Sequence, residues 1–265
     1  MKTYYFDAGL PRSGSTLITA LLNQNPQIHA GTLSPVFEVM YYTRDRLQGE
    51  QAQAFPKPQI FKKMVGTLID TYYSDVEEPV VVDKSRAWPA HINLIKEYIT
   101  SDPKILCTVR HPLDILASFI DLINNSRSIS FIDKALLQQG MFITNDTRCH
   151  FMMNPGGIIW ESMNALATAF RQNQTQHIHF IQYDDLVENP KRVMQNIHSF
   201  LRMKPYEYDF ENIEAKYREK DTEVYGLPTM HEVRKTIEKK SKHYSEVLSE
   251  EVINKYKDLD FWNKR

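Results

Sequence analysis

Glycine and hydroxyl residues near the amino terminus are spaced as an anion-binding loop requires. Gly9 to Thr16 read Gly-Leu-Pro-Arg-Ser-Gly-Ser-Thr, directly after the apolar run from Tyr4 to Ala8 and directly before a helical pattern. Glycines let the backbone turn tightly with its N–H groups pointing inward, and a helix N-terminus adds unpaired donors and partial positive charge. An ordinary strand–turn–helix connection with a serine cap has a similar sequence. The pattern therefore favours phosphate binding without naming the ligand.

The loop differs from a Walker A loop at one informative position. A Walker A loop carries lysine where this chain has Ser15, and that lysine reaches the β- and γ-phosphates of a nucleotide. The nearest fixed cation here is Arg12. The one strand pattern that ends in an acidic residue runs from Val80 to Asp83, and Lys84 follows it at once. A Mg²⁺-dependent nucleotide kinase or NTPase is an alternative that the missing lysine disfavours.

A second cationic group ends the clearest central strand pattern, which runs from Lys104 to Arg110. His111-Pro112 opens the next helical pattern, and Ser118 follows Arg110 by eight residues. A guanidinium at the strand end and a hydroxyl two turns into the helix can together bind a second phosphate. Taken alone, an arginine at a strand end such as Arg110 more commonly forms a surface ion pair. The expectation therefore depends on the two motifs occurring in this order.

These two blocks resemble the nucleotide-binding motifs of the sulfotransferase family. Pro11 to Leu17 is similar to its 5′-phosphosulfate loop, and Val109 to Pro112 with Ser118 is similar to its 3′-phosphate motif. The resemblance implies 3′-phosphoadenosine 5′-phosphosulfate (PAPS) as donor and 3′-phosphoadenosine 5′-phosphate (PAP) as product. It implies sulfuryl transfer to a hydroxyl of a sugar, a small alcohol or a tyrosine, without a metal. The pattern is of a bacterial or viral type, with some similarity to tyrosylprotein sulfotransferases.

The resemblance also assigns roles to individual residues. Arg12 with the loop residues Ser13, Gly14, Ser15 and Thr16 would bind the 5′-phosphosulfate, and Arg110 with Ser118 the 3′-phosphate. Lys84 lies where these enzymes carry a lysine that contacts the phosphate–sulfate bridge, so Lys84 and Arg12 would be catalytic. Tyr183 is similar to a tyrosine whose ring lies near the adenine. Ser241 and Lys255 fall near late nucleotide contacts, on a looser alignment.

The general base is where this chain differs from its apparent relatives. Tyrosylprotein sulfotransferases carry a glutamate after the first helix, but this chain has Leu33 at that spacing. Cytosolic small-molecule sulfotransferases place a histidine two residues after the strand-end lysine, where this chain has Arg86. Glu38 is the predicted base, with His29 and His111 as weaker alternatives. A non-catalytic relative that binds the nucleotide without turnover is the second alternative function.

A parallel sheet is the scaffold that brings such strand ends together. Short β-rich runs alternate with turns and helical patterns, which is typical of βαβ units. The sequence predicts a P-loop-like three-layer α/β/α fold with a central parallel sheet of about four to five strands and helical insertions. One domain would span residues 1–265, with helical excursions at about 34–73 and 131–170 and a charged tail from about 207. The predicted strands are Tyr4 to Ala8, Val80 to Asp83, Lys104 to Arg110 and His177 to Gln182.

Composition narrows the remaining classes. The formal net charge is −1, with 42% hydrophobic and 25% charged residues, which is ordinary for a globular protein and does not favour nucleic acid as a partner. The basic stretch from Arg234 through Lys242 is as consistent with a solvated helix face as with a binding site. The sequence has no signal core and no run of about 18 apolar residues. We therefore expect a cytoplasmic protein that does not bind membranes, in an oligomeric state left open.

Overall fold

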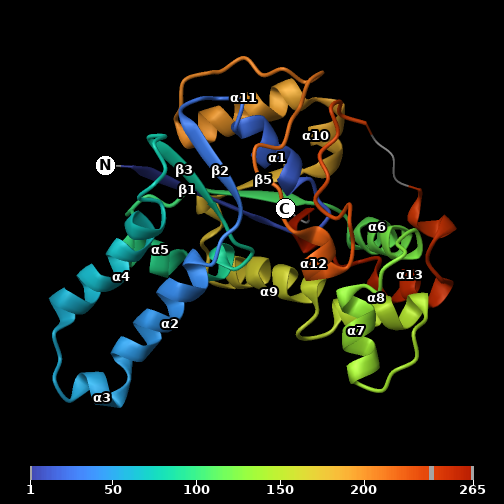
Figure 1. The fold of residues 1–265 in the computed structure, drawn as a ribbon, viewed down its shortest axis with the longest axis horizontal. Coiled ribbons are helices and arrows are strands. Elements are labelled where there is room, and N and C mark those ends of the chain that lie inside the picture. Colours follow the sequence, from blue (N-terminus) through green and yellow to red (C-terminus); the bar gives the residue numbers. More distant parts are fainter. Residues whose placement is uncertain (1, 239–241, 264–265) are drawn as a thin grey trace.

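The computed structural model describes residues 2–238 and 242–263 and is built on a five-stranded parallel sheet (Figure 1). The strand order is β2-β3-β1-β4-β5, so β1 lies in the middle between β3 and β4. This arrangement confirms the predicted parallel sheet of four to five strands. The strands are β1 (Thr3–Gly9), β2 (Ile28–Leu33), β3 (Val80–Lys84), β4 (Ile105–Val109) and β5 (Ile178–Gln182).

Helices connect the strands and cover both faces of the sheet (Figure 1). The α-helices are α1 (Ser15–Leu22), α2 (Val36–Gln48), α3 (Glu50–Gln53), α4 (Pro58–Tyr72), α5 (Ile92–Tyr98), α6 (Pro112–Asn124), α7 (Phe131–Gln138), α8 (Asn145–Met153), α9 (Ile158–Arg171), α10 (Tyr183–Glu188), α11 (Pro190–Leu201), α12 (Asp221–Tyr225) and α13 (Glu250–Tyr256). Short 3₁₀ helices are η1 (Trp88–His91), η2 (Thr175–His177), η3 (Tyr244–Glu246) and η4 (Phe261–Asn263).

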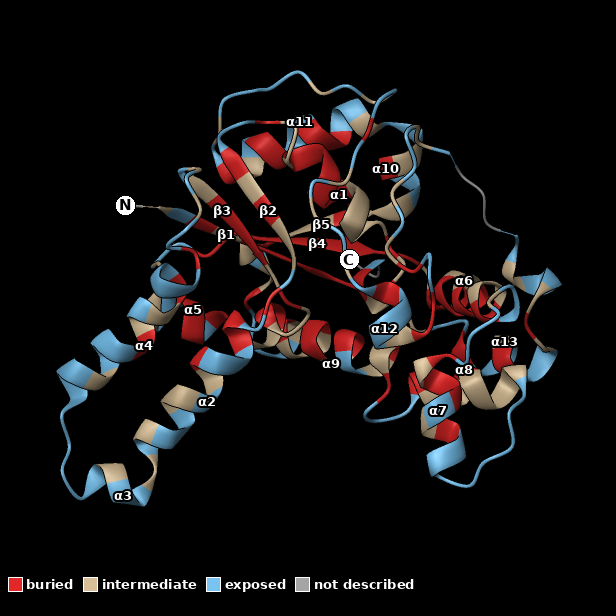
Figure 2. Cartoon of the chain, in the orientation of Figure 1, coloured by how far each residue is buried: buried red, intermediate tan, exposed pale blue. Residues whose placement is uncertain are grey.

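Two hydrophobic clusters, one on each face of the sheet, establish the predicted three-layer α/β/α architecture. Strand β4 shows the division, because Ile105, Cys107 and Val109 belong to one cluster and Leu106 to the other. Helices α1 and α11 pack in the Leu106 cluster, and α5, α6 and α9 pack in the larger one. All five residues of β4 are buried, as expected for a strand covered on both faces (Figure 2).

Strand β2 was not located by the sequence pattern. Its sequence, Ile-His-Ala-Gly-Thr-Leu, lacks the β-branched run that identifies β3 and β4, and it pairs only with β3 at the edge of the sheet. Ile28 and Ala30 are buried, whereas Leu33 is exposed. An edge strand is covered less completely, so it lacks the continuous apolar run that marks a strand buried on both faces. The helices α2, α3 and α4 that follow β2 extend away from the sheet (Figure 1).

The parallel arrangement places the carboxyl ends of the strands at one edge of the sheet. Gly9 ends β1, Lys84 ends β3, Arg110 follows β4 and Tyr183 follows β5. Strand order reverses on either side of β1, since β3 lies on one side and β4 on the other. Ligands in open α/β sheets bind at such a reversal point, outside the carboxyl ends of the strands.

Candidate active site

The loop after β1 has the backbone conformation that its glycines predict. Gly9 has φ +138° and Gly14 has φ +95°, and Arg12 between them is left-handed at φ +58°. A Cβ on Gly9 would lie 2.5 Å from the carbonyl oxygen of Thr108 on the neighbouring strand, so only glycine fits there. A Cβ on Gly14 would lie 3.0 Å from Leu186. The tight turn therefore depends on two glycines and one strained arginine.

Donors at the start of α1 are left free by this turn. Within the described part of the chain, the amide N–H groups of Ser15, Thr16 and Leu17 donate to no protein acceptor, whereas Ile18 N–H donates to Gly14 O at 3.1 Å. Unpaired amides at a helix N-terminus form an anion site. Ser13 has a different role from its neighbours, because its buried hydroxyl lies 2.7 Å from Thr108 Oγ1 and 3.0 Å from Thr108 O. The Ser13 side chain therefore fastens the loop to β4.

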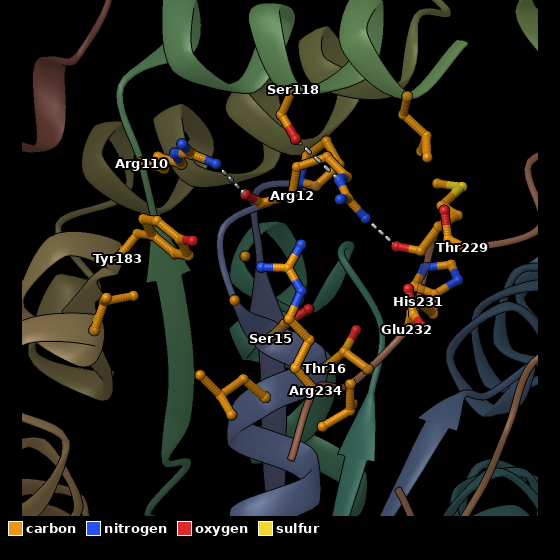
Figure 3. Close-up of a pocket in the computed structure, with 18 of the residues that line it drawn as sticks. Arg12, Ser15, Thr16, Arg110, Ser118, Tyr183, Thr229, His231, Glu232 and Arg234 are labelled. Carbon is orange, nitrogen blue, oxygen red and sulfur yellow. Dashed lines mark hydrogen bonds between the residues drawn. The ribbon is translucent and has the colours of Figure 1, made fainter. Parts of the chain in front are cut away.

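A cavity of about 380 Å³ opens over this loop (Figure 3). The strand ends and α6 form one wall, and the irregular chain from Thr229 to Glu238, together with Lys242, forms the opposite wall. Figure 3 shows Arg110 and Tyr183 on one side, with Thr229, His231 and Glu232 across from them. Of the described residues, the basic ones that line the cavity are Arg12, Lys84, Arg86, Arg110, Arg234 and Lys242. An anionic ligand is the chemistry that this lining fits.

Arg110, Tyr183, Arg12 and Ser118 come together on one side of the cavity. The Arg110 guanidinium lies 4.2 Å from the centre of the Tyr183 ring and donates to Arg12 O at 3.2 Å. Arg12 Nε donates to Ser118 Oγ at 3.2 Å, and Arg12 also donates to the carbonyl of Met230. These contacts fix the positions of the Arg12 and Arg110 guanidinium groups relative to the Ser118 hydroxyl and the Tyr183 ring. The loop from Gly9 to Thr16 and the motif of Arg110 and Ser118 are about a hundred residues apart in the sequence, and both line this one cavity.

Lys84 lines the cavity from the end of β3 and has a buried partner that the sequence analysis missed. Its Nζ lies 3.8 Å from Asp7 Oδ2, with side chains 13% and 2% exposed. The two residues are directly paired in the β1–β3 register. Burial raises the pKa of Asp7 to about 7, although the charge of Lys84 acts in the opposite direction. Burial lowers the pKa of Lys84, and Asp7 partly offsets that effect.

The chain after Glu219 contributes the wall that the sequence analysis did not predict. The described part of the basic stretch is not the solvated helix that its composition allows, because Arg234 to Glu238 have no helical structure. Arg234 lines the cavity, and Figure 3 shows it beside Thr16 at the start of α1. Glu219 and His231 also line the cavity, and Asp221 lies behind them. The high density of charged residues in this stretch was the one feature of the sequence that could have indicated its place beside the cavity.

Two other predicted site residues do not line the cavity, and a third is outside the described part of the chain. Glu38 is exposed on α2 and is not among the described residues that line the cavity. Lys255 is exposed on α13, where its Nζ lies 5.4 Å from the ring centre of Tyr256. Ser241 lies outside the described residues. The roles of these three residues stay predictions.

Comparisons with known proteins agree with the fold and with the motifs. The model of the sulfotransferase family matches residues 6–207. Mouse sulfotransferase SULT7A1 in complex with PAP has a similar structure, with a TM-score of 0.56 at 11% identity over 97% of this chain and 82% of that one. The sulfotransferase domain of the olefin synthase from Synechococcus PCC 7002 gives 0.54 at 17% identity over 94% and 89%.

The sulfotransferase domain from the curacin biosynthetic pathway gives a TM-score of 0.52 at 16% identity, over 98% of this chain and 92% of that domain. At such identities these structures establish the fold alone. No curated protein matches the sequence. The family match, in contrast, covers more than half of the chain and includes the loop after β1, Lys84, Arg110 and Ser118. This chain therefore belongs to the sulfotransferase family.

Proposed function

We propose that the chain transfers the sulfuryl group of PAPS to an acceptor hydroxyl. The observation that carries the proposal is the position of two anion-binding groups in one cavity. The free amides of α1 lie at one of them, and Arg110 with Ser118 lies at the other. PAPS carries a phosphosulfate at its 5′ end and a phosphate at its 3′ end, so it needs two such groups. A nucleoside triphosphate needs only the first.

The contacts support a division of roles between the residues. Arg12 and the amides from Ser13 to Thr16 would bind the 5′-phosphosulfate, and Arg110 with Ser118 would bind the 3′-phosphate. Tyr183, stacked under the Arg110 guanidinium, would contact the adenine. Binding energy gained at the 3′-phosphate, far from the sulfur, then positions the sulfur for attack.

Lys84 is the group best placed to stabilise the leaving oxygen. It extends from the strand beside the loop, and it lines both the main cavity and a small adjoining one that Thr16 and His231 also line. A protonated amine there can bind the negative charge that develops on the bridge oxygen when the sulfur–oxygen bond breaks. Asp7 is paired with Lys84 in the sheet, and the ionised form of its carboxyl favours the charged form of the lysine.

The finer predictions from the sequence are retained as parts of this proposal. The acceptor is a sugar, a small alcohol or a tyrosine, no metal takes part, and the location is cytoplasmic. Among the described residues, no helix is long and apolar enough to span a membrane.

The proposal is tested by ligand-dependent thermal stabilisation. PAP at about 100 times its Kd should stabilise the protein by about 2.7 kcal/mol, measured as a rise in melting temperature. ATP with Mg²⁺ at the same concentration should stabilise it much less, because it has no 3′-phosphate. A preference for ATP·Mg²⁺ would instead indicate a nucleotide kinase or NTPase. Incubation of labelled PAPS with sugars, alcohols and tyrosine peptides then identifies the acceptor and separates an enzyme from a non-catalytic binder.

A further inference from the structure

Sulfuryl transfer to a hydroxyl releases a proton, and the proposed function leaves that proton without a receiver. Glu38, the base predicted from the sequence, is exposed and does not line the cavity with the other described residues. The wall opposite Arg110 contains a group better suited to the task. His231, Asp221 and Glu219 form a largely buried cluster there, with side chains 14%, 9% and 13% exposed.

Asp221 holds His231 at two points. Its Oδ1 lies 2.6 Å from His231 Nδ1, and its Oδ2 accepts the backbone N–H of His231 at 2.7 Å. These contacts fix both the main chain and the ring orientation. They require a proton on Nδ1, because a carboxylate only accepts hydrogen bonds, and they therefore leave the lone pair on Nε2. No described residue forms a hydrogen bond with Nε2.

Glu219 and Tyr225 complete the surroundings of the ring. Glu219 Oε2 lies 3.3 Å from His231 Nδ1 and accepts the Tyr225 hydroxyl at 3.3 Å, while the Tyr225 ring packs edge-on against the imidazole. Burial lowers the pKa of His231, and the charge of Lys84 acts in the same direction. Asp221 and Glu219 act to raise that pKa. A neutral imidazole is the form that can accept a proton.

We propose that His231 is the general base of the reaction and that Asp221 is the residue that positions it. This inference rests on the proposed function. His231 lines the small cavity together with Lys84 and Thr16, so the base lies near the group that would stabilise the leaving oxygen. The two positions at which the resembling enzymes carry their base are occupied in this chain by Leu33 and Arg86, which cannot serve as one.

The step balances with the groups named. The acceptor hydroxyl gives its proton to Nε2 of His231, and the acceptor oxygen forms a bond to sulfur. The bond between sulfur and the bridge oxygen of PAPS breaks, and its electron pair stays on that oxygen beside Lys84. The products are a sulfate ester, PAP and an imidazolium, which Asp221 stabilises and which then releases its proton to solvent.

Three variants separate a base from a structural histidine. His231→Asn keeps a donor for Asp221 but removes the basic nitrogen. Asp221→Asn keeps the size of the side chain and removes its charge. His150→Asn is the matched control, because His150 is also partly buried and contacts Tyr256 Oη at 2.8 Å and Glu251 Oε1 at 3.4 Å, away from the cavity. The assay is release of PAP from PAPS with glucose, N-acetyltyrosine amide or, without either, water as acceptor.

We expect His231→Asn to lower kcat by about 10²–10⁴-fold. PAP affinity, measured by thermal shift, should be unchanged, and the acid limb of the kcat–pH profile should disappear. Asp221→Asn should move that limb to lower pH, because loss of the carboxylate lowers the pKa of His231. Glu38→Gln and His150→Asn should leave the profile unchanged. Added imidazole should partly restore His231→Ala.

Three results would overturn the inference. They are an unchanged acid limb in His231→Asn, loss of that limb in Glu38→Gln, and loss of turnover on treatment with EDTA that Mn²⁺ restores. The last result would show that Glu219, Asp221 and His231, whose ligand atoms lie within 4.8 Å of one another, hold a cation instead. Failure of the wild-type protein to bind PAP would refute the proposed function itself, and retained PAP binding keeps the two failures distinct.

Discussion

Replacing Arg110 tests whether the second anion site recognises a 3′-phosphate. Arg110 is only 7% exposed. Its guanidinium lies over the Tyr183 ring and donates to the carbonyl oxygen of Arg12. Arg110→Ala therefore removes a cation that would contact the ligand, and it also removes the hydrogen bond from Arg110 to the carbonyl oxygen of Arg12 in the loop. The two effects can be separated because only one of them depends on the 3′-phosphate.

The measurement compares PAP with AMP, which lacks the 3′-phosphate, on wild type and variant. A hydrogen bond to a charged group contributes about 1.5–3 kcal/mol. Arg110→Ala should therefore weaken PAP binding by about 10- to 150-fold more than it weakens AMP binding. Loosening of the loop through the lost Arg12 contact affects both ligands equally and cancels in the ratio. Isothermal titration at fixed salt gives all four affinities, since ionic strength alters such contacts.

The control is Ser118→Ala, which removes a neutral hydroxyl that lines the same cavity. Its single hydrogen bond to the charged 3′-phosphate should contribute about 1.5 kcal/mol to PAP binding, the lower end of that range, and nothing to AMP binding. Equal losses of PAP and AMP affinity in Arg110→Ala would place the 3′-phosphate elsewhere. The motif would then serve only to hold Arg12 and the loop, and the case for PAPS as donor would lose its main support.

Three further predictions concern the strand ends. Lys84→Ala should lower kcat by about 10²–10⁴-fold while PAP affinity falls much less, measured by steady-state kinetics and titration; unchanged turnover would remove Lys84 from the mechanism. Gly9→Ala should lower the free energy of unfolding by more than about 2 kcal/mol in urea, because φ +138° and the Thr108 carbonyl both exclude a Cβ. Asp7→Asn should become progressively more stable relative to wild type between about pH 4 and pH 7. In that range the unfolded Asp7 ionises from its ordinary pKa of 3.8 while the folded carboxyl, with its pKa raised to about 7, stays protonated and wild-type stability falls. A stability difference that does not change with pH would show that Asp7 is ionised in the fold throughout.

The parts of the site that the sequence predicted are those whose determinants are local. The loop from Gly9 to Thr16 is one short segment, and its conformation follows from two glycines and the helix that it opens. Arg110 and Ser118 are connected by one strand end and two turns of helix, so their relative position is also local. The strands β3 and β4 were recognised because continuous Val, Ile and Leu runs are typical of strands covered on both faces.

The parts that the sequence did not predict depend on the path of the chain. Glu219, Asp221 and His231 come from irregular structure and a short helix, and no periodicity relates them. Asp7 looked like one residue of a strand, and only the β1–β3 register pairs it with Lys84. An acidic residue inside a predicted strand is a signal in itself, because burying an ionised carboxylate is costly unless a cation faces it.

The two walls of the cavity differ in how they relate to the family. The loop after β1, Lys84, Arg110 and Tyr183 all lie within residues 6–207, which the family model matches. The described residues of the opposite wall, between Glu219 and Glu238 and at Lys242, follow the matched segment. Donor recognition needs the same two phosphate contacts whatever the acceptor, whereas the base must be placed to suit the acceptor. This difference predicts that the residues that bind the donor lie within the family pattern and that the base lies on the chain beyond it. Exchanges of residues 219–238 between relatives should therefore alter acceptor turnover more than PAP affinity.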